Sequence, residues 1–326
     1  MQAAINRRVF LASAGAASLV SPYTAAAVEP FTLWGPPAAP SVVLAQAVSS
    51  GALKDIDASA VFKTWRTPDE MRAGISSGRM QAVIVPTNAA ANLYNRGLGV
   101  HLLNVMTRGL LYVVARDGVE SIKDLSSKKV AVPFRNDMPD FILRRLLAKA
   151  GMQAGKDIHL EYAGTPPEAM QMLIAGRVDA ALLAEPAATA AILRAKVGLA
   201  SFKRAIDVQQ EWAKIVGGRS FIPQAGLAVT RSLIDRIGRG GLEALQKAMA
   251  SAVDFVVEHP FRASLASATE FGVMSPVVAE SIAYSNLAAL PASSIRIELE
   301  AFFSILSEDD PRIIGGKLPD SAFYAL

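Results

Sequence analysis

The chain has 326 residues, of which 52% are hydrophobic and 19% are charged, and this length is enough for two domains with separate cores. Its 33 basic and 29 acidic residues give a net charge of +4, and the absence of a dense Lys/Arg cluster with interleaved aromatics argues against nucleic acid as a partner. The absence of cysteine excludes disulfides, thiolate catalysis and iron–sulfur clusters, and the three histidines are too far apart for metal-ligand spacing. We therefore expect no cofactor and no metal.

Residues 1–27 carry the features of an export signal. Arg7 and Arg8 precede a short, weakly apolar run over residues 11–20, and Ala25–Ala27 provides a small-residue cleavage site. The paired arginines favour the bacterial twin-arginine route, with an ordinary secretory signal as the alternative. The apolar run is too short to span a bilayer. Removal of the signal leaves 31 basic and 29 acidic residues, a net charge of +2.

The sequence after the signal repeats itself with an offset of 98 residues. Residues 67–90 (TPDEMRAGISSGRMQAVIVPTNAA) and 165–188 (TPPEAMQMLIAGRVDAALLAEPAA) share eight identities in 24 positions. Both copies open with T-P-x-E, which predicts a capping box with proline in the first helical turn. Both then reach a glycine, Gly78 or Gly176, that is typical of a left-handed helix C-terminus.

The segments before each copy also correspond, so each half is predicted to run β-loop-α-β-α-β-α. The predicted strands cover residues 31–34, 56–65, 80–85, 129–133, 159–163 and 178–183. Short, continuous apolar strands are typical of a buried parallel sheet. The sequence therefore predicts two similar α/β lobes with a ligand cleft where the strands end and the helices begin.

Two similar β-runs, residues 110–117 (LLYVVARD) and 226–232 (GLAVTRS), are interpreted as strands that cross between the lobes. On this interpretation the first lobe comprises residues 28–115 and 230–326, and the second comprises residues 116–229. The remaining chain is predicted to be mostly helical and to return to the first lobe. The predicted C-terminal helices cover residues 241–257, 261–271, 276–286 and 295–306.

Four stretches together resemble a known family. They are IKDLSSKKVAVPFRND (122–137), LLAKAGMQAGKDIHLEYAG (146–164), GRVDAALLAEPAATAA (176–191) and GGKLPDSAFY (315–324). The G-x-V-D-A-x-x-x-x-E-P pattern, with D-L-x-x-K-K-V-A-V upstream, resembles the periplasmic solute-binding proteins of ABC importers, in the nitrate/sulfonate/taurine and thiamine-precursor-like branch. The resemblance implies a type II periplasmic binding protein, an α/β fold of two Rossmann-like lobes joined by two hinge strands.

The resemblance also implies a function and partners. The expected protein is a monomeric periplasmic receptor without a lipid anchor, which binds a small organic molecule and delivers it to an inner-membrane ABC permease with its ATPase. A periplasmic sensor that reports the solute to a membrane kinase is an alternative. An enzyme of the thiamine-pyrimidine-synthase type is disfavoured, because those enzymes rely on a cysteine-rich motif, a histidine and iron. We expect no enzymatic activity.

The repeat selects candidate ligand-binding residues at equivalent strand ends of the two lobes. Thr87 aligns with Glu185, and Asn88 aligns with Pro186, so these residues are expected to face one another across the cleft. Glu185 suits an amine, an amidine or a donor-rich heterocycle. The alternative is that Glu185 stabilises the first turn of its helix.

The loops after the first strand of each lobe supply the remaining candidates. Trp34, Gly35 and Pro36 begin a stiff turn, and Trp34 is expected either to stack on a planar ligand or to pack in the core. In the second lobe, Arg135 is expected either to pair with a carboxylate or sulfonate or to be solvated, and Asn136 is expected to hydrogen-bond the ligand.

The chemistry of the solute stays open at the level of the sequence. Gln224 and Ala225, just before the second crossing strand, are predicted wall residues. In sulfonate-binding relatives the residue before the proline is often aspartate preceded by an aromatic residue, so Ala184-Glu185 weakens a sulfonate assignment. Thiamine-precursor-like pyrimidines, other amine- or amide-bearing molecules, sulfonates and carboxylates are the candidates.

Overall fold

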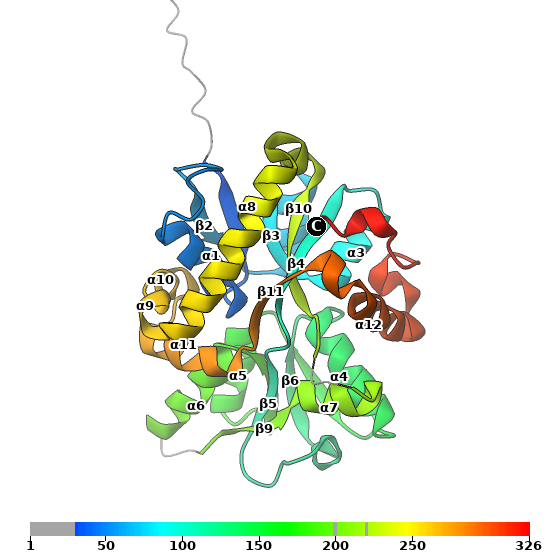
Figure 1. Cartoon of the computed structure of the whole chain (residues 1–326). Coiled ribbons are helices and arrows are strands. Elements are labelled where there is room, and N and C mark those ends of the chain that lie inside the picture. The colour runs from blue at the N-terminus through cyan, green and yellow to red at the C-terminus, as the bar shows by residue number, and fades with distance from the viewer. Residues whose placement is uncertain (1–29, 198–200, 219–220) are drawn as a thin grey trace, which may run out of the picture.

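The computed structural model describes residues 30–197, 201–218 and 221–326, so the predicted export signal lies outside the described residues. The described chain forms two lobes, one above the other, each built around one sheet (Figure 1). The first sheet has the strand order β11 (Leu287–Pro291), β4 (Val100–Thr107), β10 (Ala225–Thr230), β3 (Ala82–Pro86), β1 (Thr32–Gly35) and β2 (Val61–Thr64). The second has the order β7 (His159–Ala163), β6 (Lys129–Pro133), β8 (Ala180–Ala184), β5 (Leu111–Ala115) and β9 (Lys203–Asp207).

The three repeated strands of each lobe pair in parallel, as predicted, and each sheet also contains an inserted antiparallel strand. In the first sheet β10 begins with Ala225 opposite Pro86, and in the second β5 begins with Leu111 opposite Ala184. Pro86 and Ala184 are related by the 98-residue offset of the repeat. The repeat therefore extends to strand register, and the two lobes present equivalent strand ends to each other.

Six helices belong to the repeated halves, and the T-P-x-E helices among them begin at the predicted caps. The six are α1 (Pro40–Ser49), α2 (Pro68–Ser76), α3 (Thr87–Asn95), α4 (Met138–Lys149), α5 (Pro166–Ile174) and α6 (Ala187–Val197). The Thr67 hydroxyl accepts the Glu70 N–H at 3.2 Å, and the Thr165 hydroxyl accepts the Glu168 N–H at 3.3 Å. Both glutamates accept the N–H of the residue before the capping threonine, at 2.8 Å, one position earlier than in a capping box.

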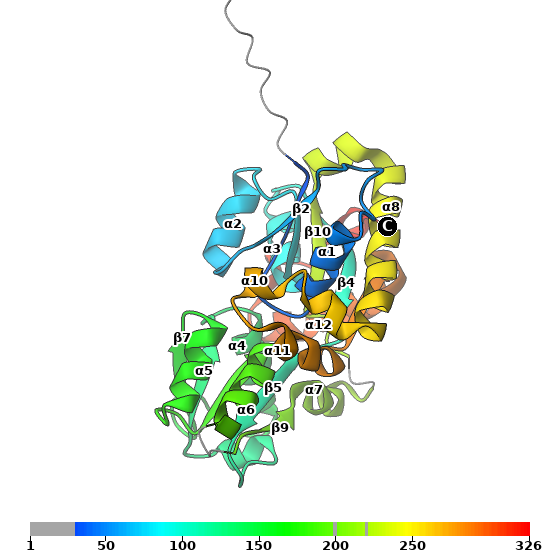
Figure 2. The ribbon, with the colours of Figure 1, turned by 90° about the vertical axis from the view of Figure 1, so that its left-hand side faces the viewer.

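The remaining helices include elements that the sequence patterns did not predict. They are α7 (Val208–Val216), α8 (Arg231–Glu258), α9 (Pro260–Ser264), α10 (Ala268–Phe271), α11 (Ser275–Ser281) and α12 (Arg296–Asp309), with 3-10 turns η1 (Ile122–Leu125), η2 (Ile282–Tyr284), η3 (Ala292–Ile295), η4 (Pro311–Ile314) and η5 (Ser321–Phe323). Helix α8 packs on α1 and β11 joins the first sheet, whereas α11 packs on α6 of the second lobe (Figure 2). The C-terminal region therefore contacts both lobes and does not return to the first lobe alone.

The chain crosses between the lobes just before each predicted crossing strand, which corrects the expected boundaries. Strand β5 pairs wholly within the second sheet, and β10 wholly within the first, so the expected divisions after residues 115 and 229 lie several residues too late. The two crossing segments bond to each other through the Ile222 N–H, which donates to the Arg108 carbonyl at 2.9 Å. The Asn286 side chain donates to the Gly109 carbonyl at 2.8 Å. Gly109 has a φ of 122°, and a Cβ there would lie 2.1 Å from Gln209, so only glycine fits this crossing.

The start of the first sheet is fixed by one carboxylate. Asp57 accepts hydrogen bonds from the Ser59 hydroxyl at 2.6 Å and from the N–H groups of Phe31 and Ser59, both at 2.8 Å. These hydrogen bonds, the Ser59 hydroxyl first, lower the pKa of Asp57 below its ordinary value. Within the described residues, no helix is both long and apolar enough to cross a membrane.

Candidate functional site

A cavity of ≈ 110 Å³ lies between the lobes, where the strand ends of both sheets meet the helix N-termini. Its walls come from the loop after β1, the ends of β3, β6 and β8, the first residues of β5 and β10, and the starts of α1, α2, α4, α5 and α6. Eight of its 21 lining residues are prolines: Pro36, Pro37, Pro40, Pro68, Pro86, Pro133, Pro139 and Pro166. This position, at the carboxyl ends of strands from two sheets, is the expected ligand site of such a fold.

Direct contacts between residues of the two lobes bridge this cleft. The Ala39 N–H, at the start of α1, donates to the Glu185 carbonyl at 3.0 Å. The Arg72 guanidinium of the first lobe pairs with the Asp137 carboxylate of the second at 2.7 Å, and Asp137 also accepts the Met138 N–H at 2.8 Å. Burial raises the pKa of Asp137, while Arg72 opposes this shift. The cleft is therefore closed in this structure.

The Glu185 side chain is turned away from the cavity and is completely buried. Its carboxylate accepts hydrogen bonds from Arg204 at 2.8 Å, the Thr189 hydroxyl at 2.7 Å and the Thr189 N–H at 3.1 Å. The Arg204 guanidinium lies 3.4 Å from the centre of the Tyr284 ring. Burial raises the pKa of Glu185, and Arg204 and Thr189 act in the opposite direction. Glu185 thus fits the alternative of a helix-stabilising carboxylate, with Arg204 as an unforeseen partner, and not the expectation of a cation-binding residue.

Thr87 and Asn88, the other residues predicted from the repeat, also do not line the cavity. The Thr87 hydroxyl donates to the Pro223 carbonyl at 2.5 Å, and the Thr87 N–H donates to the Gln224 carbonyl at 3.2 Å. Thr87 therefore faces the second crossing segment, and not Glu185. Asn88 is buried, its Oδ1 has no partner among the described residues, and it lines a separate hollow of ≈ 240 Å³.

In the first-lobe loop, only Pro36 of the three predicted residues lines the cavity. Trp34 is buried in the core, with the Arg79 guanidinium 5.1 Å from its ring centre, which agrees with the packing alternative. Gly35 lies beneath the wall, where a Cβ would be 2.2 Å from the Ser41 hydroxyl. Gly35 thus allows the close approach of β1 and α1 and does not contact the cavity.

In the second-lobe loop, neither predicted residue lines the cavity. Arg135 is exposed and lies over the Tyr162 ring, 5.0 Å from its centre. Asn136 has a φ of 58°, donates its backbone N–H to Asp140 at 2.9 Å and lines the same separate hollow as Asn88. Their neighbour Phe134 does line the cavity, as do Gln224 and Ala225, the two predicted wall residues.

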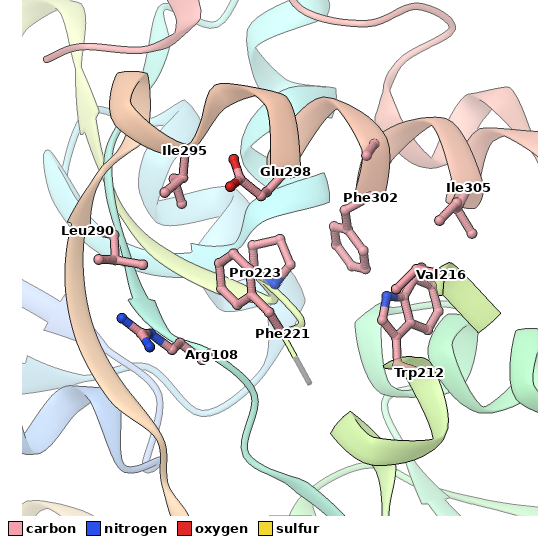
Figure 3. A pocket seen from close by; sticks show the side chains of 11 residues that line it. Arg108, Trp212, Val216, Phe221, Pro223, Leu290, Ile295, Glu298, Phe302 and Ile305 are labelled. Atoms are coloured by element: carbon pink, nitrogen blue, oxygen red, sulfur yellow. The ribbon is translucent and has the colours of Figure 1, made fainter. Parts of the chain in front are cut away.

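A larger hollow of ≈ 590 Å³ lies on the side of the crossing segments, between α7 and α12. Trp212 of the second lobe and Phe302 of the first meet there edge to face, with ring centres 5.4 Å apart (Figure 3). Phe221 and Pro223 of the second crossing segment complete this apolar surface. None of its described lining residues lies at the end of a repeated strand, so we take the interlobe cavity as the candidate site.

Solved structures with this fold define its class. The chain is similar to an ABC transporter protein from Parabacteroides distasonis, with a TM-score of 0.73 and 21% identity over 91% of this chain and 99% of that one. It is also similar to the periplasmic aliphatic sulphonate binding protein SsuA from Escherichia coli (TM-score 0.70, 15% identity, 91% and 92% coverage). A third similar structure is the periplasmic nitrate-binding protein NrtA from Synechocystis PCC 6803, with a TM-score of 0.61 and 14% identity over 78% of this chain and 70% of that one. The fold is that of the type II periplasmic binding proteins.

The sequence comparison gives the family. Residues 54–269, more than half of the chain, match the model of the NMT1-like family, and the chain belongs to that family. No curated protein matches it in sequence.

Proposed function

We propose that this chain is the solute-binding receptor of an ABC importer, which binds a small organic molecule in the interlobe cleft and delivers it to a membrane permease. The observation that carries the proposal is the cavity itself. It is lined from both lobes, lies at the strand ends of both sheets and is bridged by the Ala39–Glu185 and Arg72–Asp137 contacts. A solute that touches both walls binds the closed form preferentially and shifts the population toward it.

A panel of small amines, amides, pyrimidines, carboxylates and sulfonates tests this role. A true solute is expected to raise the melting temperature, through about 2.7 kcal/mol of stabilisation at a hundredfold excess over Kd. It is also expected to decrease the radius of gyration in X-ray scattering, since the lobes close. The absence of any stabilising solute in the panel, together with no molecule retained by the natively purified protein, would contradict the proposal.

Delivery to a permease is tested with candidate ABC permeases reconstituted with their ATPases. The solute-loaded protein is expected to stimulate the ATPase of one of them, whereas stimulation of a membrane kinase alone would support the sensor alternative. We further propose that the protein works as a monomer in the periplasm after removal of residues 1–27. A reporter fused to those residues is expected to be exported only in cells with a functional twin-arginine translocase.

A further inference from the structure

The lining of the cleft has a composition that restricts its ligand. Of the 21 lining residues, none that the structure describes is Lys, Arg or His. Apart from the Trp65 indole, whose N–H is bound to the Ile84 carbonyl at 3.0 Å, only Asp137 and Gln224 of this described lining carry hydrogen-bonding side chains. An anion in this cleft would lose its hydration without gaining a cationic partner, which is costly.

The single carboxylate in the described lining does not call for a cationic ligand. Asp137 is 3% exposed, and its two oxygens already bind the Arg72 guanidinium and the Met138 N–H. The nearby Glu185 charge is balanced by Arg204 and is not part of the lining. Both negative charges of this region are thus compensated within the protein.

At five of the helix N-termini around the cleft, one backbone donor that could bind an anion is either absent or already used. Helices α1, α2 and α5 begin with Pro40, Pro68 and Pro166, which have no N–H. At α3 the Thr87 N–H is taken by the Gln224 carbonyl, and at α4 the Met138 N–H is taken by Asp137. The positive ends of these helix dipoles face the cleft. The N–H groups named here are nevertheless either absent, at the prolines, or already bonded within the protein, at α3 and α4.

One side chain of the lining has a buried oxygen without a partner among the described residues. The Gln224 side chain is 6% exposed and lines the cavity, and its Oε1 is buried with no hydrogen-bond donor in the described part of the chain. Its backbone is fixed, because the N–H donates to the Ile222 carbonyl at 2.7 Å and the carbonyl accepts from Thr87. A buried acceptor without a partner costs free energy, so a ligand that donates to it gains affinity and selectivity.

We propose that the cleft selects a small, uncharged and mostly apolar solute with one N–H or O–H donor, and that Gln224 is the residue that accepts this donor. The proposal rests on the proposed receptor function and names its substrate class. The size agrees with it, since a cavity of ≈ 110 Å³ is smaller than the cavity of about 150 Å³ that accommodates benzene in another protein. Sulfonates and nitrate are disfavoured as solutes.

Matched pairs of molecules that differ in charge test the proposal. The pairs are isobutyramide and isobutyrate, propionamide and propionate, and ethanesulfonamide and ethanesulfonate, with binding followed by ligand-observed NMR titration. Each uncharged member is expected to bind at least about tenfold more tightly than its acid. Gln224→Leu is expected to weaken binding of the uncharged member about tenfold. Gln81→Leu is the matched control, because Gln81 directly precedes β3 at the end of that strand away from the cavity. This variant is expected to change the affinity for neither member of a pair.

Equal or tighter binding of the acids, or unchanged binding by a folded Gln224→Leu variant, would overturn the proposal. If no member of any pair binds, the charge of the solute identified with the broad panel tests the proposal. An uncharged donor-bearing solute supports the inference, whereas an anionic or cationic one refutes it and leaves the receptor function intact. Failure of every solute class removes the receptor function itself.

Discussion

Glu185 is the residue at which substitution is most informative, because the sequence pattern and the structure assign it different roles. A cation-binding carboxylate would lose affinity in Glu185→Gln without loss of stability. In the structure, Glu185 is instead half of an internal ion pair with Arg204, at 2.7 Å, and it also holds the first turn of α6 through Thr189. We therefore expect substitution to act on stability and to leave affinity for the solute nearly unchanged.

The magnitude follows from what each substitution leaves behind. Glu185→Ala leaves the Arg204 guanidinium, whose side chain is 15% exposed, without its counter-charge. Removal of one partner of a buried ion pair costs about 3–5 kcal/mol. Because Arg204 still stacks on the Tyr284 ring, we expect the lower end of this range, about 3 kcal/mol. Glu185→Gln keeps an oxygen for Thr189 and relieves the burial penalty that raises the pKa of Glu185, so we expect a loss of about 1 kcal/mol.

Thermal and urea unfolding measure these losses, and calorimetry with the identified solute measures affinity. At about 2 °C per kcal/mol for a chain of this size, Glu185→Ala should lower the melting temperature by about 6 °C and Glu185→Gln by about 2 °C. Arg204→Met combined with Glu185→Ala should recover part of the loss, because it removes the unpaired charge. A tenfold fall in affinity with unchanged melting temperature in Glu185→Gln would refute this reasoning.

Three further outcomes follow from individual contacts in the fold. Gly35→Ala should lower the free energy of unfolding in urea by about 1–3 kcal/mol, because its Cβ would collide with Ser41 in the first turn of α1. A decrease of less than about 0.5 kcal/mol would contradict this close contact. Asp137→Asn should increase the radius of gyration without solute, because it removes the bridge between the buried Asp137 carboxylate and the partly exposed Arg72, and solvent screening of Arg72 limits this pair to about 1 kcal/mol. Asp69→Asn, on the same lobe as Arg72, should not change the radius of gyration. Because the pKa of Asp57 is lowered on folding, its stabilising contribution is present above the ordinary pKa of 3.8 and is lost as pH falls through the lower folded value. Unfolding of Asp57→Asn measured from pH 6 to pH 2 should therefore show a smaller loss of stability than wild type, and identical slopes would exclude this linkage.

The parts of the fold that repeat were accessible from the sequence, because local signals determine them. Strands at 129–133 and 159–163 have the predicted bounds, and both T-P-x-E caps form. Strands β4, β9 and β11 were missed. Polar or charged residues interrupt the short apolar patterns of β4 and β9, and β11 is a five-residue stretch that ends in proline. The crossing points were misplaced because similarity between two β-runs does not say on which side of each run the chain changes sheets.

The candidate site was less predictable because it depends on partners distant in sequence. Glu185 was correctly placed at a strand end, but Arg204, which determines the direction of its side chain, lies in the unpredicted strand β9. Trp34 and Arg135 are close in sequence to wall residues but face the core and the solvent. Local pattern thus located the wall segments, and packing between elements determined which side chains reach the cavity.

The eight prolines of the wall have a thermodynamic consequence for binding. A proline has a fixed φ, so the rim has little backbone freedom left to lose when a solute arrives. The backbone of this rim would therefore add less to the entropic cost of binding a solute than a rim of the same length without proline.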